Sequence, residues 1–281
     1  MSCYDGFEDF YNLDIRKDRV VSPVVMEHKI KKYSGILPEE LVKDKNILEI
    51  GSCMGDAGHW CLSHGAKQYT GVEIQEEFYK KSKKLLSHWG DKAINVNMDL
   101  ETYLNTLNNF KFDLTIFFGV LYAFPNPVDI LEKVFNSSNK TVVIDSMTPI
   151  MILNKKLIEY PMVEHIDRPM IISQEGQLSY SGFSNYPSKT YVEKVGNVKG
   201  FSSIELPIVG ENYDGEILSN TDEIPVRYFS RFDKTHDEVL TLQERIKTND
   251  ISELSDLHFN KTNMQEVMKV AADNLKKIKG V

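Results

Sequence analysis

The sequence of 281 residues has few cysteines and no long apolar run. Its three cysteines, Cys3, Cys53 and Cys61, are an odd number without the paired spacing of a metal site, so we expect free thiols in a reducing cytoplasm. No window approaches the roughly 18 consecutive apolar residues of a membrane helix. The first residues, MSCYDGFEDFYNLD, are acidic and aromatic and lack the apolar segment of an export signal. We therefore expect a cytoplasmic protein that does not engage a membrane.

The sequence also lacks a surplus of basic residues. It contains 33 Lys and Arg against 41 Asp and Glu, which gives a formal net charge of -8. Binding to nucleic acid through phosphates alone normally needs an excess of positive charge, so this composition disfavours it. The run KKSKK, residues 80–84, is expected to form a solvated helix face, with contact to RNA phosphates as the alternative.

From Asn46 onward, short β-like runs alternate with amphipathic stretches, which is typical of βαβ units in a parallel sheet. This pattern predicts an α/β, Rossmann-like fold with a seven-stranded, mostly parallel sheet and helices on both faces. Gly65 and Gly90 are expected to end the first two helices in left-handed conformation. The first five strands are expected at residues 46–51, 68–74, 94–100, 112–119 and 141–146, and the helices between them at 56–64, 75–89, 101–108 and 127–135.

The remaining segments predict three parts. An N-terminal helical segment, 1–45, precedes the α/β domain, 46–235, and a helical C-terminal extension, 236–281, follows it. The extension has Met264, Val267, Met268 and Ala271 at helical spacing, which allows a homodimer through these helices. After the fifth strand, an insertion at 147–187 is too long for an ordinary connection. A helix from Ser188 and two edge strands, starting at Ser202 and Val226, are expected beyond it.

The insertion is either a lid or a structural layer. Its aromatic and basic side chains could bind a planar or anionic acceptor by stacking and ion pairing. They suit a small hydrophobic layer that covers the sheet equally well. These side chains are Tyr160, His165, Arg168, Tyr180, Phe183 and Tyr186.

The stretch ILEIGSCMGDAG, residues 47–58, places Gly51 and Gly55 between a strand and a helix. Such a turn is expected to point backbone N–H groups and the positive helix end at a ligand. Cys53 stands where a dinucleotide fingerprint has its middle glycine, and no Gly-Lys-Ser/Thr follows. Because Glu49 precedes the turn, a pyrophosphate is disfavoured, and the ligand is expected to be uncharged or cationic there.

Two further acids follow at expected strand ends. Glu73 ends the second strand, where a carboxylate can accept hydrogen bonds from both hydroxyls of a ribose. Asp99 ends the third strand and can accept a hydrogen bond from an exocyclic amine such as that of adenine, with Leu100 packing beside the ring. Asp99 can equally be the N-cap of the next helix.

Together these residues resemble a known family. EIGSCMG, residues 49–55, resembles motif I of the class I S-adenosylmethionine-dependent methyltransferases, and Glu73 and Asp99 match the next two acidic motifs. The resemblance implies a methyltransferase with S-adenosyl-L-methionine (SAM) as cofactor, S-adenosyl-L-homocysteine (SAH) as product, and no metal. It implies the sulfonium next to Glu49 and Gly51, the ribose on Glu73 and the adenine near Asp99. The implied cofactor site is completed by Ser52, Cys53, Gly55, Ile74, Leu100 and Gly119.

The stretch FDLTIFFGVLYAFPNPVDILEKV, residues 112–134, resembles the fourth-strand motif of the same family. Within it, GVLYAFPNP is similar to a G-V-L-Y-H-x-x-x-P pattern of methyltransferases related to the tRNA wobble-uridine carboxymethyltransferase. Ala123 stands where that pattern has histidine. RNA therefore stays an alternative acceptor.

Methyl transfer is an in-line displacement, so the protein mainly aligns the acceptor and excludes water, and a general base is optional. Tyr122 is expected to contact the acceptor or to be a packed aromatic, and Asp145 to act as a base or to cap the next segment. His59 is expected to be a partly buried structural histidine. In the N-terminal segment, Tyr11, Arg16 and Tyr33 either close the pocket, with Arg16 on the methionine carboxylate, or serve as scaffold.

Four functions follow from these observations. The first is a methyltransferase acting on a small-molecule acceptor, and the second is an RNA-modifying methyltransferase. The third is a non-catalytic SAM-binding protein, and the fourth uses the cofactor for aminopropyl or carboxyl chemistry. Replacing Gly51 with valine is expected to abolish cofactor binding while leaving a folded protein.

Overall fold

The computed structural model describes about two thirds of the chain. The described residues are 3–5, 23–107, 110–124, 126–147, 150–153, 156–159, 163–167, 183–204, 206, 208–211, 217–219 and 227–235. The chain divides into two units, Met1–Val239 and Leu240–Val281. The predicted C-terminal extension, 236–281, lies outside the described residues.

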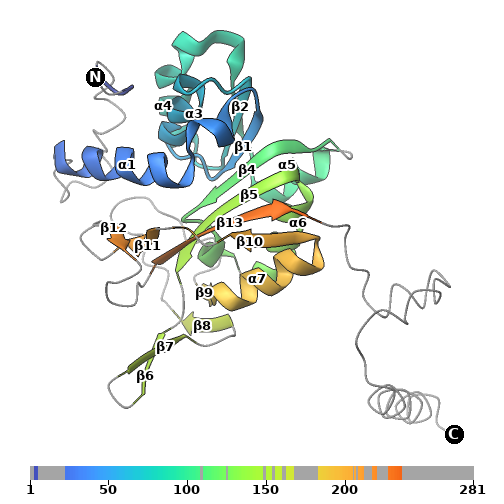
Figure 1. Cartoon of the computed structure of the whole chain (residues 1–281). Coiled ribbons are helices and arrows are strands. Elements are labelled where there is room, and N and C mark those ends of the chain that lie inside the picture. The colour runs from blue at the N-terminus through green and yellow to red at the C-terminus, as the bar shows by residue number, and fades with distance from the viewer. Residues whose placement is uncertain are drawn as a thin grey trace, which may run out of the picture. The chain divides into compact units, whose positions relative to one another are not determined.

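A seven-stranded mixed sheet forms the centre of the first unit (Figure 1). Its strand order is β10-β13-β5-β4-β1-β2-β3, and β1 through β5 are parallel to one another. β13 runs antiparallel to β5 and to β10. The predicted α/β sheet is therefore confirmed. The strands are β1 (Asn46–Ile50), β2 (Gln68–Glu73), β3 (Ala93–Asn97), β4 (Phe112–Phe118), β5 (Ser138–Met147), β10 (Phe201–Ile204) and β13 (Arg227–Lys234).

Helices cover both faces of this sheet. Side chains of α1, α2 and α3 share one hydrophobic core with the sheet, and side chains of α5, α6 and α7 share the other. The helices are α1 (Pro23–Ile36), α2 (Glu39–Val42), α3 (Asp56–Ser63), α4 (Glu76–Leu85), α5 (Leu100–Thr106), α6 (Pro127–Asn136) and α7 (Lys189–Val198), with 3-10 helices η2 (Ser87–Lys92) and η3 (Leu121–Ala123). No helix in the described part of the chain is long and apolar enough to cross a membrane.

The helix expected at 75–89 is wrong at its C-terminal end. α4 stops at Leu85, and the chain continues as η2, in which Trp89 donates its backbone N–H to Leu86, three residues back. Leu86 is fully buried, so the chain tightens there to keep it in the core. Gly90 has a positive φ of 56°, but its ψ of -134° is not that of the expected left-handed cap, and it lies inside η2. Gly65, at φ 86°, follows the end of α3 as predicted.

The single strand expected from Ser202 is also wrong. β10 ends at Ile204, and the next strand, β11 (Ile208–Glu211), pairs with β12 (Ile217–Ser219) in a separate two-stranded sheet. β10 and β13 do form the expected antiparallel edge.

The described parts of the insertion form two hairpins outside the main sheet. β6 (Ile150–Leu153) pairs with β7 (Lys156–Glu159), and β8 (Val163–Asp167) pairs with β9 (Phe183–Pro187), both antiparallel. His165 lies in β8, and Phe183 and Tyr186 lie in β9. The candidate residues Tyr160, Arg168 and Tyr180 lie outside the described residues.

Candidate cofactor and active site

The carboxyl ends of four parallel strands meet at one edge of the sheet. Ile50 of β1 pairs with Val72 of β2 and with Phe117 of β4, and Phe118 pairs with Asp145 of β5. The turn after β1 therefore lies between Glu73, which ends β2, and the β4–β5 pair. The topology thus brings the turn and Glu73 together, as the strand pattern predicts.

The turn after β1 has an unusual backbone. Gly51 and Gly55 have left-handed φ angles of 70° and 80°. Cys53 also lies in the left-handed region, at φ 49°, which costs a residue with a side chain about 1–2 kcal/mol. A strained residue of this kind persists only where its surroundings hold it.

The N–H groups of this turn are bonded within the protein. Gly51 and Ser52 donate to the carbonyl of Val72 at 2.9 and 3.1 Å, Gly55 donates to Ser52, and Cys53 donates to the Glu73 carboxylate at 2.9 Å. The expectation that these groups point at a ligand is therefore wrong for these four residues. An anion would have to displace these bonds, which agrees with the expected uncharged or cationic ligand.

Contacts with the protein itself explain both glycines. A Cβ on Gly51 would lie 2.4 Å from Cγ2 of Val120, and a Cβ on Gly55 would lie 2.7 Å from side-chain atoms of Leu86 and Ser82. No ligand is needed to account for either glycine. Gly55 serves as the left-handed N-cap of α3 and lets Ser82 of α4 and Leu86, between α4 and η2, approach it.

Glu73 is 7% exposed, and each of its carboxylate oxygens accepts one backbone N–H, Oε2 from Cys53 and Oε1 from Gln75 at 2.8 Å. Burial raises its pKa, and these hydrogen bonds oppose that shift. The Asn97 side chain donates to the carbonyls of Glu73 and Ile74, which fixes the end of β2.

Asp99 is the N-cap of α5. Its Oδ1 accepts the backbone N–H of Thr102 at 2.9 Å, and hydrogen bonds from Thr102 lower its pKa. The N-cap interpretation is confirmed, and a contact with adenine stays a prediction. Leu100 is buried, whereas Ile74, beside Glu73, is 47% exposed. An exposed apolar side chain at this edge is available to pack on a ring.

Asp56, the first residue of α3, accepts hydrogen bonds from three side chains of the N-terminal segment. Its Oδ2 accepts hydrogen bonds from Lys29 at 2.5 Å and from Tyr33 at 2.6 Å, and its backbone carbonyl accepts one from Tyr4. Burial would raise the pKa of Asp56, but the Lys29 charge and the bonds from Lys29 and Tyr33 outweigh it and lower the pKa. Tyr33 is thus buried at the turn, while Tyr11 and Arg16 lie outside the described residues.

The Lys29–Asp56 and Tyr33–Asp56 contacts were not predicted. Lys29 and Tyr33 are four residues apart in α1 and so share one helix face. A charged face of this kind normally points to solvent, and the sequence contains no sign of its partner.

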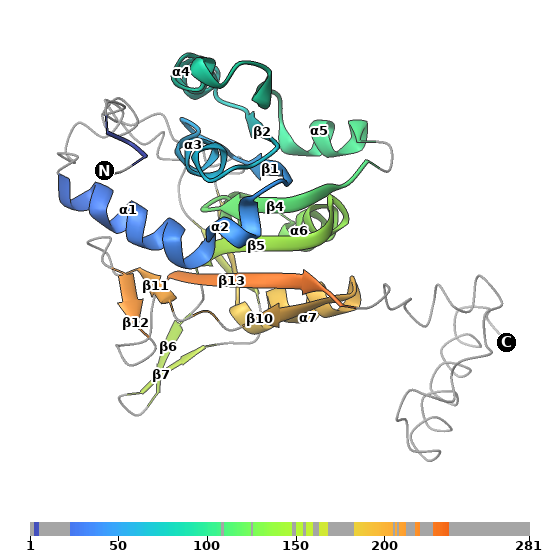
Figure 2. The ribbon, with the colours of Figure 1, turned by 45° about the horizontal axis from the view of Figure 1, so that its top comes forward.

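Asp145 is fully buried and forms an ion pair with Lys32 of α1, with Oδ2 3.2 Å from Nζ. The Lys32 ammonium also lies 5.2 Å from the ring centre of Phe118 and 4.8 Å from that of Phe229. Asp145 caps no helix, because β5 runs through it to Met147. These contacts hold α1 near the carboxyl ends of β4 and β5 (Figure 2).

Tyr122 lies in η3, just beyond the end of β4, and is half-buried. Gly119 precedes it with a left-handed φ of 67° and donates its N–H to the carbonyl of Asp145. η3 lies beside β9, so the insertion approaches the segment expected to contact an acceptor. An acceptor role for Tyr122 stays a prediction.

His59 has the predicted structural role and is fully buried. Nε2–H donates to the carbonyl of Cys3 at 2.7 Å, and Nδ1 accepts from the indole N–H of Trp89. Burial lowers its pKa, so the neutral imidazole is favoured. No disulfide joins the three cysteines, and burial raises the pKa of Cys53 to about 12, which keeps it protonated.

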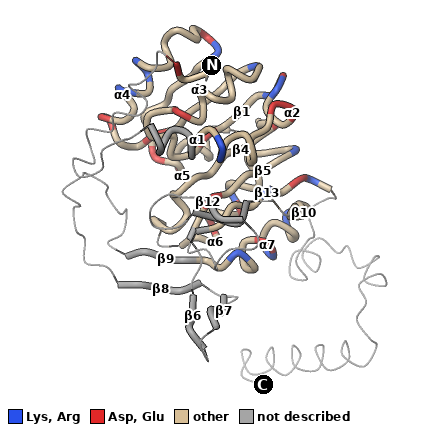
Figure 3. The backbone as a smooth tube through the Cα atoms, turned by 60° about the vertical axis from the view of Figure 1, so that its left-hand side comes forward, with Lys and Arg blue, Asp and Glu red and all other residues tan. Residues whose placement is uncertain are grey.

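The lysines of α4 are interspersed with acids. Lys80 pairs with Glu76 and Lys81 with Glu77, one helical turn apart. Figure 3 shows both charge signs along α4. The predicted solvated face is confirmed for Lys80, Lys83 and Lys84, which are exposed, whereas Lys81 is half-buried.

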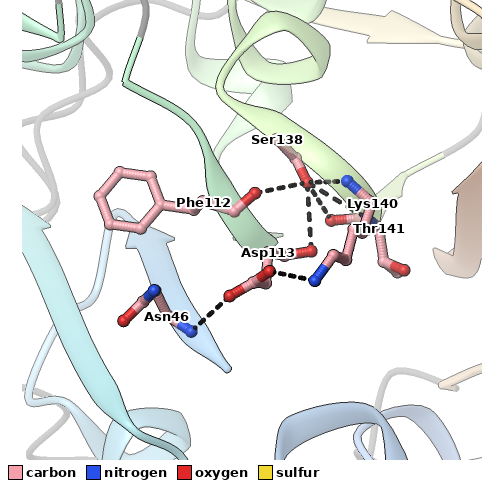
Figure 4. Close-up of polar contacts among 6 residues, drawn as sticks. All are labelled: Asn46, Phe112, Asp113, Ser138, Lys140 and Thr141. Atoms are coloured by element: carbon pink, nitrogen blue, oxygen red, sulfur yellow. Dashed lines mark hydrogen bonds and ion pairs between the residues drawn. The ribbon is translucent and has the colours of Figure 1, made fainter. Parts of the chain in front are cut away.

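A second polar cluster lies at the amino ends of the strands (Figure 4). Asp113 of β4 accepts the backbone N–H of Asn46 at 3.0 Å and pairs with Lys140 at 2.6 Å. The Ser138 hydroxyl donates to the carbonyl of Thr141 and accepts the N–H of the same residue. These contacts fix the starts of β1, β4 and β5, at the other end of the strands from the turn. The cluster therefore has a structural role.

Comparisons with known proteins agree with this geometry. Residues 48–140 match the profile of a family described as a methyltransferase domain. No curated protein sequence matches the chain.

Several solved structures share the fold. The N-terminal domain of EvdMO1 with SAH bound is 17% identical, with 76% of this chain and 82% of that chain covered and a TM-score of 0.50. Magnesium protoporphyrin IX methyltransferase (ChlM) from Synechocystis PCC 6803, with bound SAH, is 12% identical, with 82% and 95% covered and a TM-score of 0.51. An S-adenosylmethionine-dependent methyltransferase from Mesorhizobium loti is 14% identical, with 73% and 97% covered and a TM-score of 0.51.

Proposed function

We propose that this chain is a class I S-adenosylmethionine-dependent methyltransferase that transfers the methyl group of SAM to a small-molecule acceptor, because residues 48–140 match a methyltransferase domain and the sheet has the expected α/β topology. The observation that carries the cofactor assignment is the turn after β1. Its N–H groups are bonded to Val72, Ser52 and Glu73, so it offers little to a phosphate. A cationic sulfonium needs no such donors.

The buried carboxylate of Glu73 fits a ribose. Each oxygen accepts one backbone N–H, and a carboxylate oxygen can accept a second hydrogen bond. Both ribose hydroxyls can therefore bind without breaking the contacts that hold the turn. The exposed side chain of Ile74 is suited to pack against the base.

SAM, when bound, supplies an activated methyl group, and the protein residues orient the acceptor and exclude water. We assign the orienting role to Tyr122, which follows the left-handed Gly119 and lies near the insertion. Asp145 is less suited to act as a base, because it is fully buried and paired with Lys32. A carboxylate held in this way is a better anchor for α1.

The charge distribution favours a small acceptor over RNA. The formal net charge is -8, and Lys80 and Lys81 of α4 are paired with Glu76 and Glu77. Neutralised lysines bind phosphates weakly, since an RNA backbone would have to compete with the acids. The similarity of GVLYAFPNP to tRNA wobble-uridine enzymes keeps RNA modification as the second candidate.

Labelled SAM distinguishes these functions. The full chain is incubated with methyl-labelled SAM and a cell extract, which is then separated into metabolites, RNA and protein. We expect label in the metabolite fraction. We also expect the protein to retain tRNA only weakly, even at low salt. Label in RNA would replace the proposal with the second candidate, and cofactor binding without label in any fraction would favour a non-catalytic SAM-binding protein.

Replacing Glu73 with alanine is expected to weaken SAM binding by about 1–3 kcal/mol, because a charge-assisted ribose contact is lost. This corresponds to about a 5- to 150-fold increase in Kd in a calorimetric titration. The Cys53 and Gln75 N–H groups also lose their acceptor.

Glu73→Gln is the matched control. It keeps one side-chain oxygen and loses the charge, so its affinity should lie between those of the wild type and Glu73→Ala. An alanine variant that binds SAM as tightly as the wild type would show that the ribose binds elsewhere.

A further inference from the structure

Glu49 is a buried acid two residues before the turn. It is 4% exposed, and its Oε2 accepts the hydroxyl hydrogen of Tyr69 at 2.5 Å. Its partner in β4 is the apolar Ile116. The titratable groups that act on it come from α1, α3 and β2, and they are Lys29, Tyr33, Asp56, Cys61, Tyr69 and Glu73.

These neighbours oppose one another. Burial and the negative charges of Asp56 and Glu73 favour the protonated carboxyl, whereas the Tyr69 hydroxyl and the Lys29 ammonium favour the carboxylate. The first group prevails and raises the pKa of Glu49 to about 8. Glu49 thus holds a proton at neutral pH, directly before the turn assigned to the cofactor.

We propose that Glu49 releases this proton when SAM binds, and that the protein thereby distinguishes the sulfonium of SAM from the neutral sulfur of SAH. The proposal rests on the proposed function, because it requires a cation at the turn. A positive charge near a carboxyl favours its ionised form. SAH lacks the charge on sulfur, so its binding causes Glu49 to release a smaller fraction of a proton.

The sign of the pH dependence follows from linkage. Glu49 ionises near pH 8 in the free protein and at a lower pH in the complex. Between these two values binding releases a proton, so the affinity for SAM rises with pH, by at most about tenfold per pH unit. Above pH 8 the free protein has already lost the proton, and the affinity levels off. The sulfonium also lowers the pKa of the α-amino group of SAM relative to that of SAH, so the pH dependence of the SAM to SAH affinity ratio is assigned to Glu49 by its difference from Glu49→Gln.

Calorimetry tests the proposal on the full chain. SAM and SAH are titrated at pH 7 in phosphate and in Tris, whose ionisation enthalpies differ, and the SAM to SAH affinity ratio is measured between pH 6 and 9. We expect the wild type to release up to about one proton more with SAM than Glu49→Gln does. In Glu49→Gln, the affinity ratio should change less steeply with pH than in the wild type, because only the contribution of the ligands' α-amino groups remains.

Two further variants keep the test independent of the folding of Glu49→Gln. Tyr69→Phe removes a hydrogen bond to the carboxylate, so the pH at which the affinity levels off should move upward. Lys80→Ala, on the exposed face of α4, should match the wild type. SAM binding to the wild type without proton release, or equal release by Glu49→Gln, would overturn this inference and leave the proposed function intact. The absence of any SAM binding would overturn both.

Discussion

Gly51→Ala is expected to abolish SAM binding and to lower the free energy of unfolding by about 2–5 kcal/mol. Gly51 has a left-handed φ of 70°, which costs alanine about 1–2 kcal/mol. The new Cβ would also lie 2.4 Å from Cγ2 of Val120, and overpacking of this kind costs about 1–3 kcal/mol. The strain falls on the turn that connects β1 to Cys53. Denaturant unfolding and calorimetric titration with SAM measure the two effects.

A double variant separates the two causes. In Gly51→Ala/Val120→Ala, the nearest remaining contact is the Val120 Cβ position at 3.5 Å, an ordinary distance, whereas the left-handed φ is unchanged. The double variant should therefore recover about 1–3 kcal/mol relative to the single one, after correction for Val120→Ala alone. A Gly51→Ala protein that unfolds and binds SAM like the wild type would contradict the assigned turn geometry.

This result would revise the expectation from sequence for Gly51→Val. The sequence favours a folded protein that has lost only its ligand, because glycine in a strand-to-helix turn suggests close approach of a ligand. The structure instead places Val120, 69 positions along the chain, against the missing Cβ. Loss of binding and loss of stability should therefore occur together.

The local sequence pattern predicts well the strands of the sheet and the acidic residues near their ends. Strands buried on both faces have continuous apolar runs, and glycines and helix caps mark where they end. Glu73 ends β2 as predicted, whereas Asp99 lies two residues beyond the end of β3, at the N-cap of α5. Local pattern places the end of α4 less well, because the burial of Leu86 against other elements decides it.

Contacts between distant segments could not be predicted. Lys29 and Asp56 are 27 residues apart, and Lys32 and Asp145 are 113 apart. The stretch MEHKIKKY contains lysines that resemble a solvated face, like those of α4. Only the docking of α1 on the sheet edge distinguishes the buried lysines from the exposed ones. The N-terminal segment is thus bound to the turn and to β5 through two separate acids.

Asp145→Ala is expected to lower the free energy of unfolding by about 3–5 kcal/mol, as measured by denaturant unfolding. The carboxylate is fully buried and is paired with Lys32, which is 12% exposed. Removing one member of a buried pair leaves the other charge uncompensated, and this penalty exceeds the net stabilisation that the pair contributes. The Lys32 ammonium would keep its contacts with the rings of Phe118 and Phe229. These contacts replace only part of the lost attraction.

A double-mutant cycle tests whether the effect belongs to the pair. Lys32→Met/Asp145→Asn removes both charges and keeps similar volumes, so it should be more stable than Lys32→Met or Asp145→Asn alone predicts by addition. Methyl transfer at saturating substrates separates an anchor from a base. An anchor leaves appreciable turnover in the double variant, because its fold is restored, whereas a base is lost in every variant without the carboxylate. Additive stabilities together with abolished turnover in Asp145→Asn would therefore assign Asp145 to the chemistry and contradict its role in holding α1.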